Sequence, residues 1–197
     1  MSRKNIETRN RILESTWRLL ETDPGNDVRM SDIAKEAGIS RQAVYLHFPK
    51  RADLLVATTR YLDEVRDIDA RLAASRAAKT GLERLDAFIE AWGNYIPEIY
   101  GVAKALLAMK DHDKEAYNAW QGRMQAVWEG CEAAINALDR DGKLTKGLSK
   151  KEATDLLWTM LSVRNWEQFR SECNWTQARY IDVTKASARK VLVADGA

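Results

Sequence analysis

Hydrophobic residues recur every three or four positions along most of the chain, which is the spacing of helices that bury one face. Glycine, proline and short polar clusters interrupt this pattern and mark the helix ends. No segment shows the strict alternation of a half-buried strand. The pattern therefore predicts an all-α fold with about nine helices, at residues 5–22, 30–37, 40–48, 50–65, 80–95, 97–109, 114–138, 149–172 and 176–193.

Local signals predict several of the helix ends. Turn-forming residues at 23–26 should end the first helix, and the charged segment 66–71 should be a helical connector. Capping boxes should open two later helices, one with Thr80 and the other with Ser149 as the N-cap. Pro97 should break or kink the chain between the helices on either side of it.

The composition agrees with a helical protein and bears on its location. Of the residues, 45% are hydrophobic and only 3 are proline and 10 glycine, which is too few breakers for an all-β fold. No run approaches the about 18 apolar residues of a membrane span, and the first residues lack the apolar core of a signal peptide. We expect a cytoplasmic protein with no membrane partner, in which Cys131 and Cys173 are free thiols.

Charge is distributed unevenly along the chain. The first 51 residues carry a small net positive charge, and the remainder carries a small net negative charge. A modestly basic first part on a neutral body suits a DNA-contacting domain joined to one that does not touch DNA.

The segment from Met30 to Tyr45 has the spacing of a helix-turn-helix. Ala34 is small where two helices would cross, Gly38 supplies the positive φ of the tight turn, and Val44 would pack beneath the first helix. The same spacing also fits an ordinary αα-corner with a glycine turn, which has no DNA-binding role.

Longer motifs in this region resemble the head of the TetR family of bacterial repressors. They are the Asp-Ile-Ala-Lys-Glu-Ala-Gly-Ile-Ser run ending at Ser40, the Ala-Val-Tyr-Leu-His-Phe run ending at Phe48, and the helix starting at Lys50. The resemblance covers residues 10–55. It implies a three-helix DNA-binding head at residues 1–50 and a helical bundle at 51–197 that dimerises and accepts a small effector. Such a protein would be a repressor, not an enzyme, that the effector releases from a palindromic operator.

The resemblance also implies that residues 40–48 form the recognition helix. Arg41 and Gln42 are then the best base readers, because arginine pairs with guanine and glutamine with adenine. Ala43 could touch a thymine methyl group, and the family places phosphate contacts at Tyr45 and His47. Arg51 falls where the family usually has a phosphate-binding lysine at the start of the fourth helix. The complete set of expected DNA-binding residues is Arg29, Ser40, Arg41, Gln42, Ala43, Tyr45, His47, Lys50 and Arg51.

The last two predicted helices carry more apolar residues than one buried face needs. A second face could be buried against a symmetry-related copy, as the family resemblance also implies, or inside a monomeric bundle. The expected homodimer interface consists of Leu157, Leu161, Ile181, Thr184 and Ala188.

Aromatic residues form stripes on two of the body helices. They fit ordinary core packing, but the family places its effector cavity among these helices. The expected cavity is lined by Trp92, Tyr95, Ile99, Trp120, Met124, Trp128 and Trp158. Such walls favour a flat or bulky apolar effector, and a delocalised cation is an alternative.

Other readings of the chain remain open. A DNA-binding dimer could respond to a protein partner, a cysteine could act as a redox trigger, and a helical enzyme is a further alternative. The Asp111–Asp113 segment could hold a metal or cap a helix, and we expect the cap. No motif for a cofactor or a metal site is present, so neither is expected.

Overall fold

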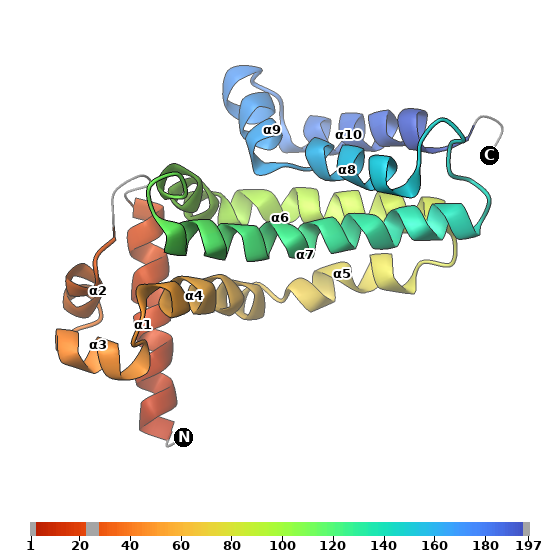
Figure 1. Ribbon diagram of the computed structural model, residues 1–197. Coiled ribbons are helices and arrows are strands. Elements are labelled where there is room, and N and C mark those ends of the chain that lie inside the picture. Colours follow the sequence, from red (N-terminus) through yellow and green to blue (C-terminus); the bar gives the residue numbers. More distant parts are fainter. Residues whose placement is uncertain (1–2, 23–27, 195–197) are drawn as a thin grey trace. The chain divides into compact units, whose positions relative to one another are not determined.

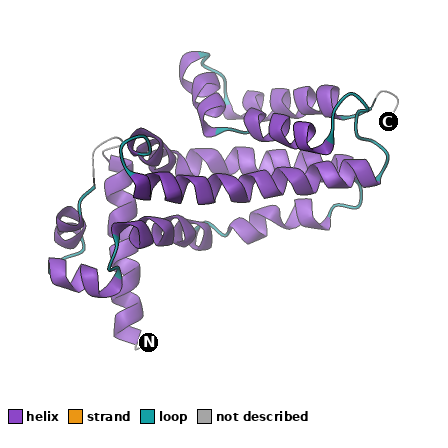
Figure 2. Cartoon of the chain, in the orientation of Figure 1, coloured by secondary structure: helices purple, strands orange, loops and turns teal. Residues whose placement is uncertain are grey.

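The computed structural model describes residues 3–22 and 28–194 of the chain, and helices make up most of them (Figure 2). Within these ranges the only β interaction is an isolated bridge between Leu144 and Val193. The turn predicted at 23–26 lies outside the described residues. The helices are α1 (Arg3–Thr22), α2 (Met30–Glu36), α3 (Arg41–His47), α4 (Arg51–Val65), α5 (Ile68–Ala77), α6 (Gly81–Met109), α7 (Lys114–Arg140), α8 (Lys150–Met160), α9 (Val163–Glu167) and α10 (Gln177–Leu192), with a π-helical turn, η1 (Gln168–Glu172), after α9 (Figure 1).

The all-α prediction is confirmed. Over the described residues, the helices number nine if α8, α9 and η1 are counted as one interrupted helix. Both predicted capping boxes are present. The hydroxyl of Thr80 accepts from the N–H of Glu83 at 3.2 Å, and the Glu152 carboxylate accepts from the N–H of Ser149 at 2.8 Å.

The residues group into two compact units. One comprises the chain up to Asp67 with Ile99–Met124, and the other comprises Ile68–Glu98 with the chain from Gln125 onward. Helices α6 and α7 each supply residues to both units. The predicted functional division into residues 1–50 and 51–197 remains a prediction.

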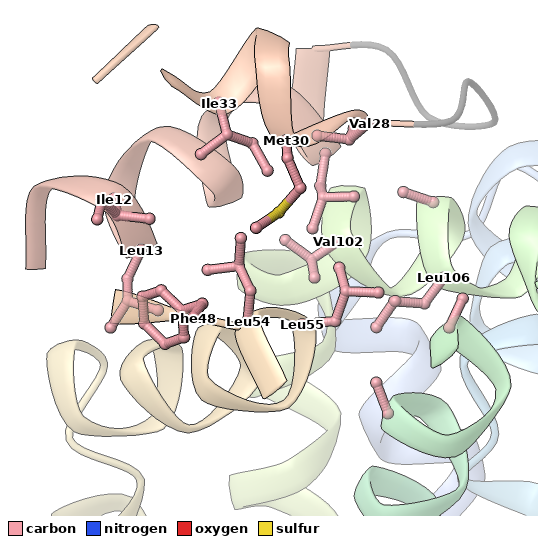
Figure 3. Close-up of a cluster of buried hydrophobic side chains, with 14 of the residues drawn as sticks. Ile12, Leu13, Val28, Met30, Ile33, Phe48, Leu54, Leu55, Val102 and Leu106 are labelled. Carbon is pink, nitrogen blue, oxygen red and sulfur yellow. The ribbon is translucent and has the colours of Figure 1, made fainter. Parts of the chain in front are cut away.

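The first unit is built around one apolar core (Figure 3). In it α1 packs against α2 and α4, and α2 packs against α3. The side chains that fill the core come from all four of these helices and from the ends of α6 and α7 in this unit. They include Ile12, Leu13, Met30, Ile33, Val44, Phe48, Leu54, Leu55, Val102 and Leu106.

In the second unit, polar contacts set the position of α10 along α6. Lys185 of α10 pairs with Glu90 at 2.6 Å, and Arg189 pairs with Asp86. Residue numbers rise along one helix as they fall along the other, so the two helices are antiparallel. Gly93 of α6 faces α10, because a Cβ there would overlap the end of the Ile181 side chain.

Helix α6 runs through Pro97 without a break, so the predicted division at this residue is wrong. Proline lacks an N–H, which leaves the carbonyl of Gly93, four residues earlier, without its usual helical donor. The side-chain amide of Gln177 donates to that carbonyl at 2.9 Å. A contact from α10 therefore satisfies the group that proline leaves free.

The single helix predicted for 149–172 is interrupted. α8 ends at Met160, and Ser162 caps α9 by accepting from the N–H of Asn165 at 3.2 Å. The indole N–H of Trp92 donates to the carbonyl of Leu161 at 2.9 Å, so an acceptor at the end of α8 is satisfied by a side chain from α6.

Candidate nucleic-acid interface

Helices α2 and α3 form the predicted helix-turn-helix. Gly38 has φ of 65°, the left-handed conformation that the turn requires. The turn is closed by the N–H of Ile39, which donates to the carbonyl of Ala34 at 3.0 Å. Ala34 and Val44 are buried, as their spacing predicts. The side of α3 that carries Val44 is thereby held against the core, and the opposite side of the helix is exposed.

Ser40 caps α3, because its hydroxyl accepts from the N–H of Ala43 at 3.1 Å. The next two residues, Arg41 and Gln42, are exposed at the first turn, while Ala43 is half-buried. Base-reading side chains are commonly found at this end of a recognition helix. The geometry agrees with the expected role of these residues and leaves that role a prediction.

Arg41 and Tyr45 lie one turn apart on α3 and contact each other. A guanidinium N–H of Arg41 donates to the Tyr45 hydroxyl at 3.3 Å, and the guanidinium lies 5.5 Å from the centre of the ring. The hydrogen bond to Tyr45 raises the pKa of Arg41. This contact restricts the Arg41 side chain before any ligand is present.

His47 lines a groove of about 530 Å³ within the first unit. Arg9 of α1 and Arg60 and Tyr61 of α4 also line it, and the Arg9 guanidinium lies 5.2 Å from the centre of the Phe48 ring. The groove contains one expected phosphate contact and none of the expected effector residues.

Two further basic residues expected at the interface, Arg29 and Lys50, are exposed. Arg29 precedes α2, and its N–H donates to the carboxylate of Asp32 at 3.3 Å. Lys50 precedes α4, and its side chain makes no capping hydrogen bond to the helix.

Arg51 has an internal set of partners that the sequence did not suggest. Its guanidinium pairs with Asp113, donates to the carbonyl of Val28 at 3.1 Å, and lies 3.8 Å from the sulfur of Met109. The side chain is only 15% exposed. A phosphate would have to compete with these partners for the Arg51 guanidinium. The side chain has a structural role, and the phosphate contact expected at Arg51 stays a prediction. No local signal could reveal it, because Asp113 is 62 residues away.

Asp113 also caps α7. Its carboxylate accepts from the N–H groups of Glu115 at 2.8 Å and Ala116 at 3.1 Å, so the predicted helix cap is confirmed. Burial alone would raise the pKa of Asp113, but these N–H groups and the Arg51 guanidinium hold it below its usual value. At the other end of α4, Asp63 pairs with Arg123 of α7. Two ion pairs thus connect the ends of α4 to α7 within this unit.

The residues expected to line the effector cavity are divided between the units. Trp92, Tyr95, Trp128 and Trp158 belong to the second unit, whereas Ile99, Trp120 and Met124 belong to the first. Their assembly into one cavity stays a prediction.

Several of these aromatic side chains have partners within the second unit. Trp92 and Tyr95 are buried edge to face, with ring centres 5.8 Å apart. The Arg71 guanidinium lies 5.6 Å from the centre of the Tyr95 ring and pairs with Glu98 at 2.7 Å. The indole N–H of Trp128 donates to Asp155 at 3.0 Å. A cation therefore already covers one face of Tyr95.

The residues expected at the dimer interface are buried within a single chain. They are Leu157, Leu161, Ile181, Thr184 and Ala188. Their periodicity correctly indicated burial, but the partner surface is in the same unit, and they retain little area for a second chain. The assignment of these residues to a dimer interface stays a prediction. The exposed large apolar side chains of α8 and α10 are Leu156 and Val191.

The two cysteines differ in accessibility. Cys131 is fully buried, and burial raises the pKa of its thiol, which disfavours the reactive thiolate. Cys173 is exposed. Among the described helices, none combines the length and apolar character that a membrane crossing requires.

Comparison with known proteins supports the interpretation of the head. Residues 12–58 match the family model for bacterial regulatory proteins of the tetR family. The transcriptional regulator EthR of Mycobacterium tuberculosis is 32% identical over 136 residues, which are 66% of this chain and 60% of EthR. The nucleoid occlusion factor SlmA of Idiomarina loihiensis is 22% identical over 72% of this chain and 70% of its own length.

Solved structures share the whole fold at low sequence identity. A transcriptional regulator from Saccharomonospora viridis, crystallised with choline, is 18% identical with a TM-score of 0.76 and covers 95% of this chain and 98% of its own. NalD of Pseudomonas aeruginosa, the secondary repressor of a multidrug efflux pump, is 19% identical with a TM-score of 0.72 and covers 98% of this chain and 100% of its own. The sequence matches agree with the helix-turn-helix geometry of α2 and α3, and residues 12–58 are a helix-turn-helix head of the tetR family of bacterial regulatory proteins.

Proposed function

We propose that this chain is a transcriptional repressor that binds a palindromic operator as a homodimer and is released by a small effector. The observation that carries the proposal is the exposed pair Arg41 and Gln42 at the capped start of α3, opposite the buried Val44. In a helix-turn-helix, the second helix packs one side against the core and presents exposed polar side chains at its start to the major groove.

The homodimer follows from the size of the reading surface. One recognition helix reads only a half-site, so a specific operator needs two helices related by two-fold symmetry. The outer faces of α8 and α10 are the best candidates for the contact, since Leu156 and Val191 are exposed there. Small exposed residues such as Ala186 and Ser187 of α10 would let a second copy approach closely.

Replacement of Arg41 by alanine should relax sequence preference. We expect a loss of about 1–3 kcal/mol in binding at one base position of the half-site, because a bidentate contact to guanine is lost. The measurement starts from a random DNA pool, from which the wild-type protein selects its site. Binding of every single-base variant is then compared for both proteins at fixed salt.

A matched control is Arg164→Ala, which removes an exposed arginine of α9. It should leave both affinity and preference unchanged. If Arg41→Ala binds all variants in the wild-type order with the wild-type spacing, Arg41 does not read a base. If the wild-type protein selects no sequence at all, the repressor proposal fails.

The effector is proposed to be a flat or bulky apolar molecule that stacks on aromatic side chains of the helical body. Aromatic walls favour stacking and apolar contact over hydrogen bonding. The choline bound to the Saccharomonospora protein makes a quaternary ammonium the rival class. Against a cation stands the Arg71 guanidinium, which already lies over Tyr95 with Glu98 as its counter-charge.

The two ion pairs of α4 offer a route from effector to operator. Asp113 and Arg123 of the α7 region hold Arg51 and Asp63 at the two ends of α4. α7 also carries three of the seven residues expected around the effector, Trp120, Met124 and Trp128. A shift of α7 would therefore move α4 and the recognition helix before it, and a coupling of about 1–3 kcal/mol would suffice.

Effector binding should be weaker when operator is bound. Titration of neutral aromatic compounds and quaternary ammonium ions, followed by tryptophan fluorescence, should identify a binder whose affinity drops when the selected DNA is added. Trp120→Ala should weaken that binder, while Tyr117→Ala, which alters an exposed aromatic residue of the same helix, should not. Equal affinity with and without DNA would rule out induction by that compound. A panel without any binder would favour a dimer that answers to a protein partner.

A further inference from the structure

Leu46 is the most exposed large hydrophobic side chain in the described part of the chain, at 79%. It lies on α3, two residues after Val44, which is fully buried. The two side chains point to opposite sides of a short helix that is fixed by its cap and its core contact. Leu46 therefore belongs to the outer side of α3 and does not contribute to the core.

The outer side of α3 carries two rows of residues spaced one turn apart. Arg41 and Tyr45 form one row and are tied by their hydrogen bond and ring contact. Gln42 and Leu46 form the other, because residues four apart lie on the same face of a helix. Both side chains of this second row are exposed, so a surface brought against α3 would meet an amide beside an apolar group.

The major groove offers few partners to such a pair. Base edges there present hydrogen-bonding atoms, and the methyl group of thymine is their apolar feature. We propose that Leu46 contacts a thymine methyl group in each half-site, next to the base read by Gln42. This proposal rests on the proposed repressor function and adds thymine to the sequence that the recognition helix specifies.

Leu46 suits this contact better than Ala43, to which a thymine contact was assigned from the sequence. Ala43 is half-buried and its side chain is a single methyl group. The leucine side chain is longer and stands free on the outer side of the helix. The two assignments make different predictions. If Leu46 makes the thymine contact, replacement of Leu46 by alanine abolishes it, whereas a contact made by Ala43 would remain.

Deoxyuridine tests the contact, since it differs from thymidine only by the missing methyl group. Each thymine of the half-site selected by the wild-type protein is replaced in turn, and affinities are measured for wild-type protein and Leu46→Ala at one salt concentration. At one position the affinity of the wild-type protein should fall about fourfold, which is the effect expected when one methyl group is no longer buried. Leu46→Ala should bind both versions of that position equally.

Val65→Ala is the matched control, because it shortens an exposed apolar side chain on α4. It should keep the wild-type response to deoxyuridine, and both variants should keep the wild-type melting temperature. The proposal is overturned if the half-site contains no thymine, if no replacement weakens the wild-type protein, or if Leu46→Ala remains sensitive at the same position. In those cases specific binding still supports the repressor function, whereas loss of all sequence selection would contradict that function itself.

Discussion

Ile181→Asp should unfold the second unit instead of producing a folded monomer. Ile181 is 7% exposed within one chain, and the end of its side chain packs against Gly93 of α6. An unpaired carboxylate in this contact costs several kcal/mol, a large part of the about 5–15 kcal/mol that stabilises a typical domain. Urea denaturation followed by circular dichroism should show a much lower midpoint or no cooperative transition.

The contrast with Val191→Asp makes the result specific. Val191 is on the same helix but is 41% exposed, so the aspartate stays in water and the free energy of unfolding should change by about 0.5 kcal/mol or less. This variant should instead weaken self-association in sedimentation experiments. A soluble, cooperatively folding monomer of Ile181→Asp would instead support the dimer interface expected from the sequence.

Asp113→Ala should lower the free energy of unfolding by about 3–5 kcal/mol. The substitution removes the cap of α7 and leaves the Arg51 guanidinium without its carboxylate in a partly buried position. Loss of a helix cap alone costs about 1 kcal/mol, so most of the effect comes from the uncompensated charge. Chemical denaturation of wild-type and variant protein at neutral pH measures the difference.

Asp113→Asn separates the two contributions, because asparagine is also a good N-cap but carries no charge. Its deficit relative to the wild type should shrink in acid. The folded-state pKa of Asp113 is held below its ordinary value of 3.8, so the carboxylate stabilises the fold above that pH and the gain is lost as the pH falls through the folded-state pKa. An Asp113→Ala protein as stable as the wild type would show that the ion pair between Arg51 and Asp113 does not stabilise the fold.

Features that depend on neighbours in the sequence could be predicted. The turn at Gly38, the cap at Ser40 and the capping boxes at Thr80 and Ser149 involve residues a few positions apart, and all are present. The break expected at Pro97 is absent, and the carbonyl of Gly93 receives its donor from Gln177, which is 84 positions away from Gly93. A rule based on neighbouring residues predicts the hydrogen bond that a proline removes. It does not predict that a side chain of another helix replaces this bond.

The same limit applies to the candidate site. The exposed residues at the start of α3 follow from a motif of about 16 residues, and their positions could be predicted. Arg51 could not be assigned its partner, because the charge of Asp113 is brought to it only by the fold. For Ile181 and its neighbours, periodicity shows that a face is buried but does not show whether the same chain or another covers it.

The contact between Gln177 and the carbonyl that Pro97 leaves free has an evolutionary consequence. Gln177 donates to this carbonyl, which lacks its usual helical donor because residue 97 is proline. In relatives with another residue at position 97, the helix would supply its own donor, and the amide at position 177 would keep only its contacts to Asn94 and Trp166. We expect the two positions to covary among related sequences, with glutamine or another donor retained where the proline is retained.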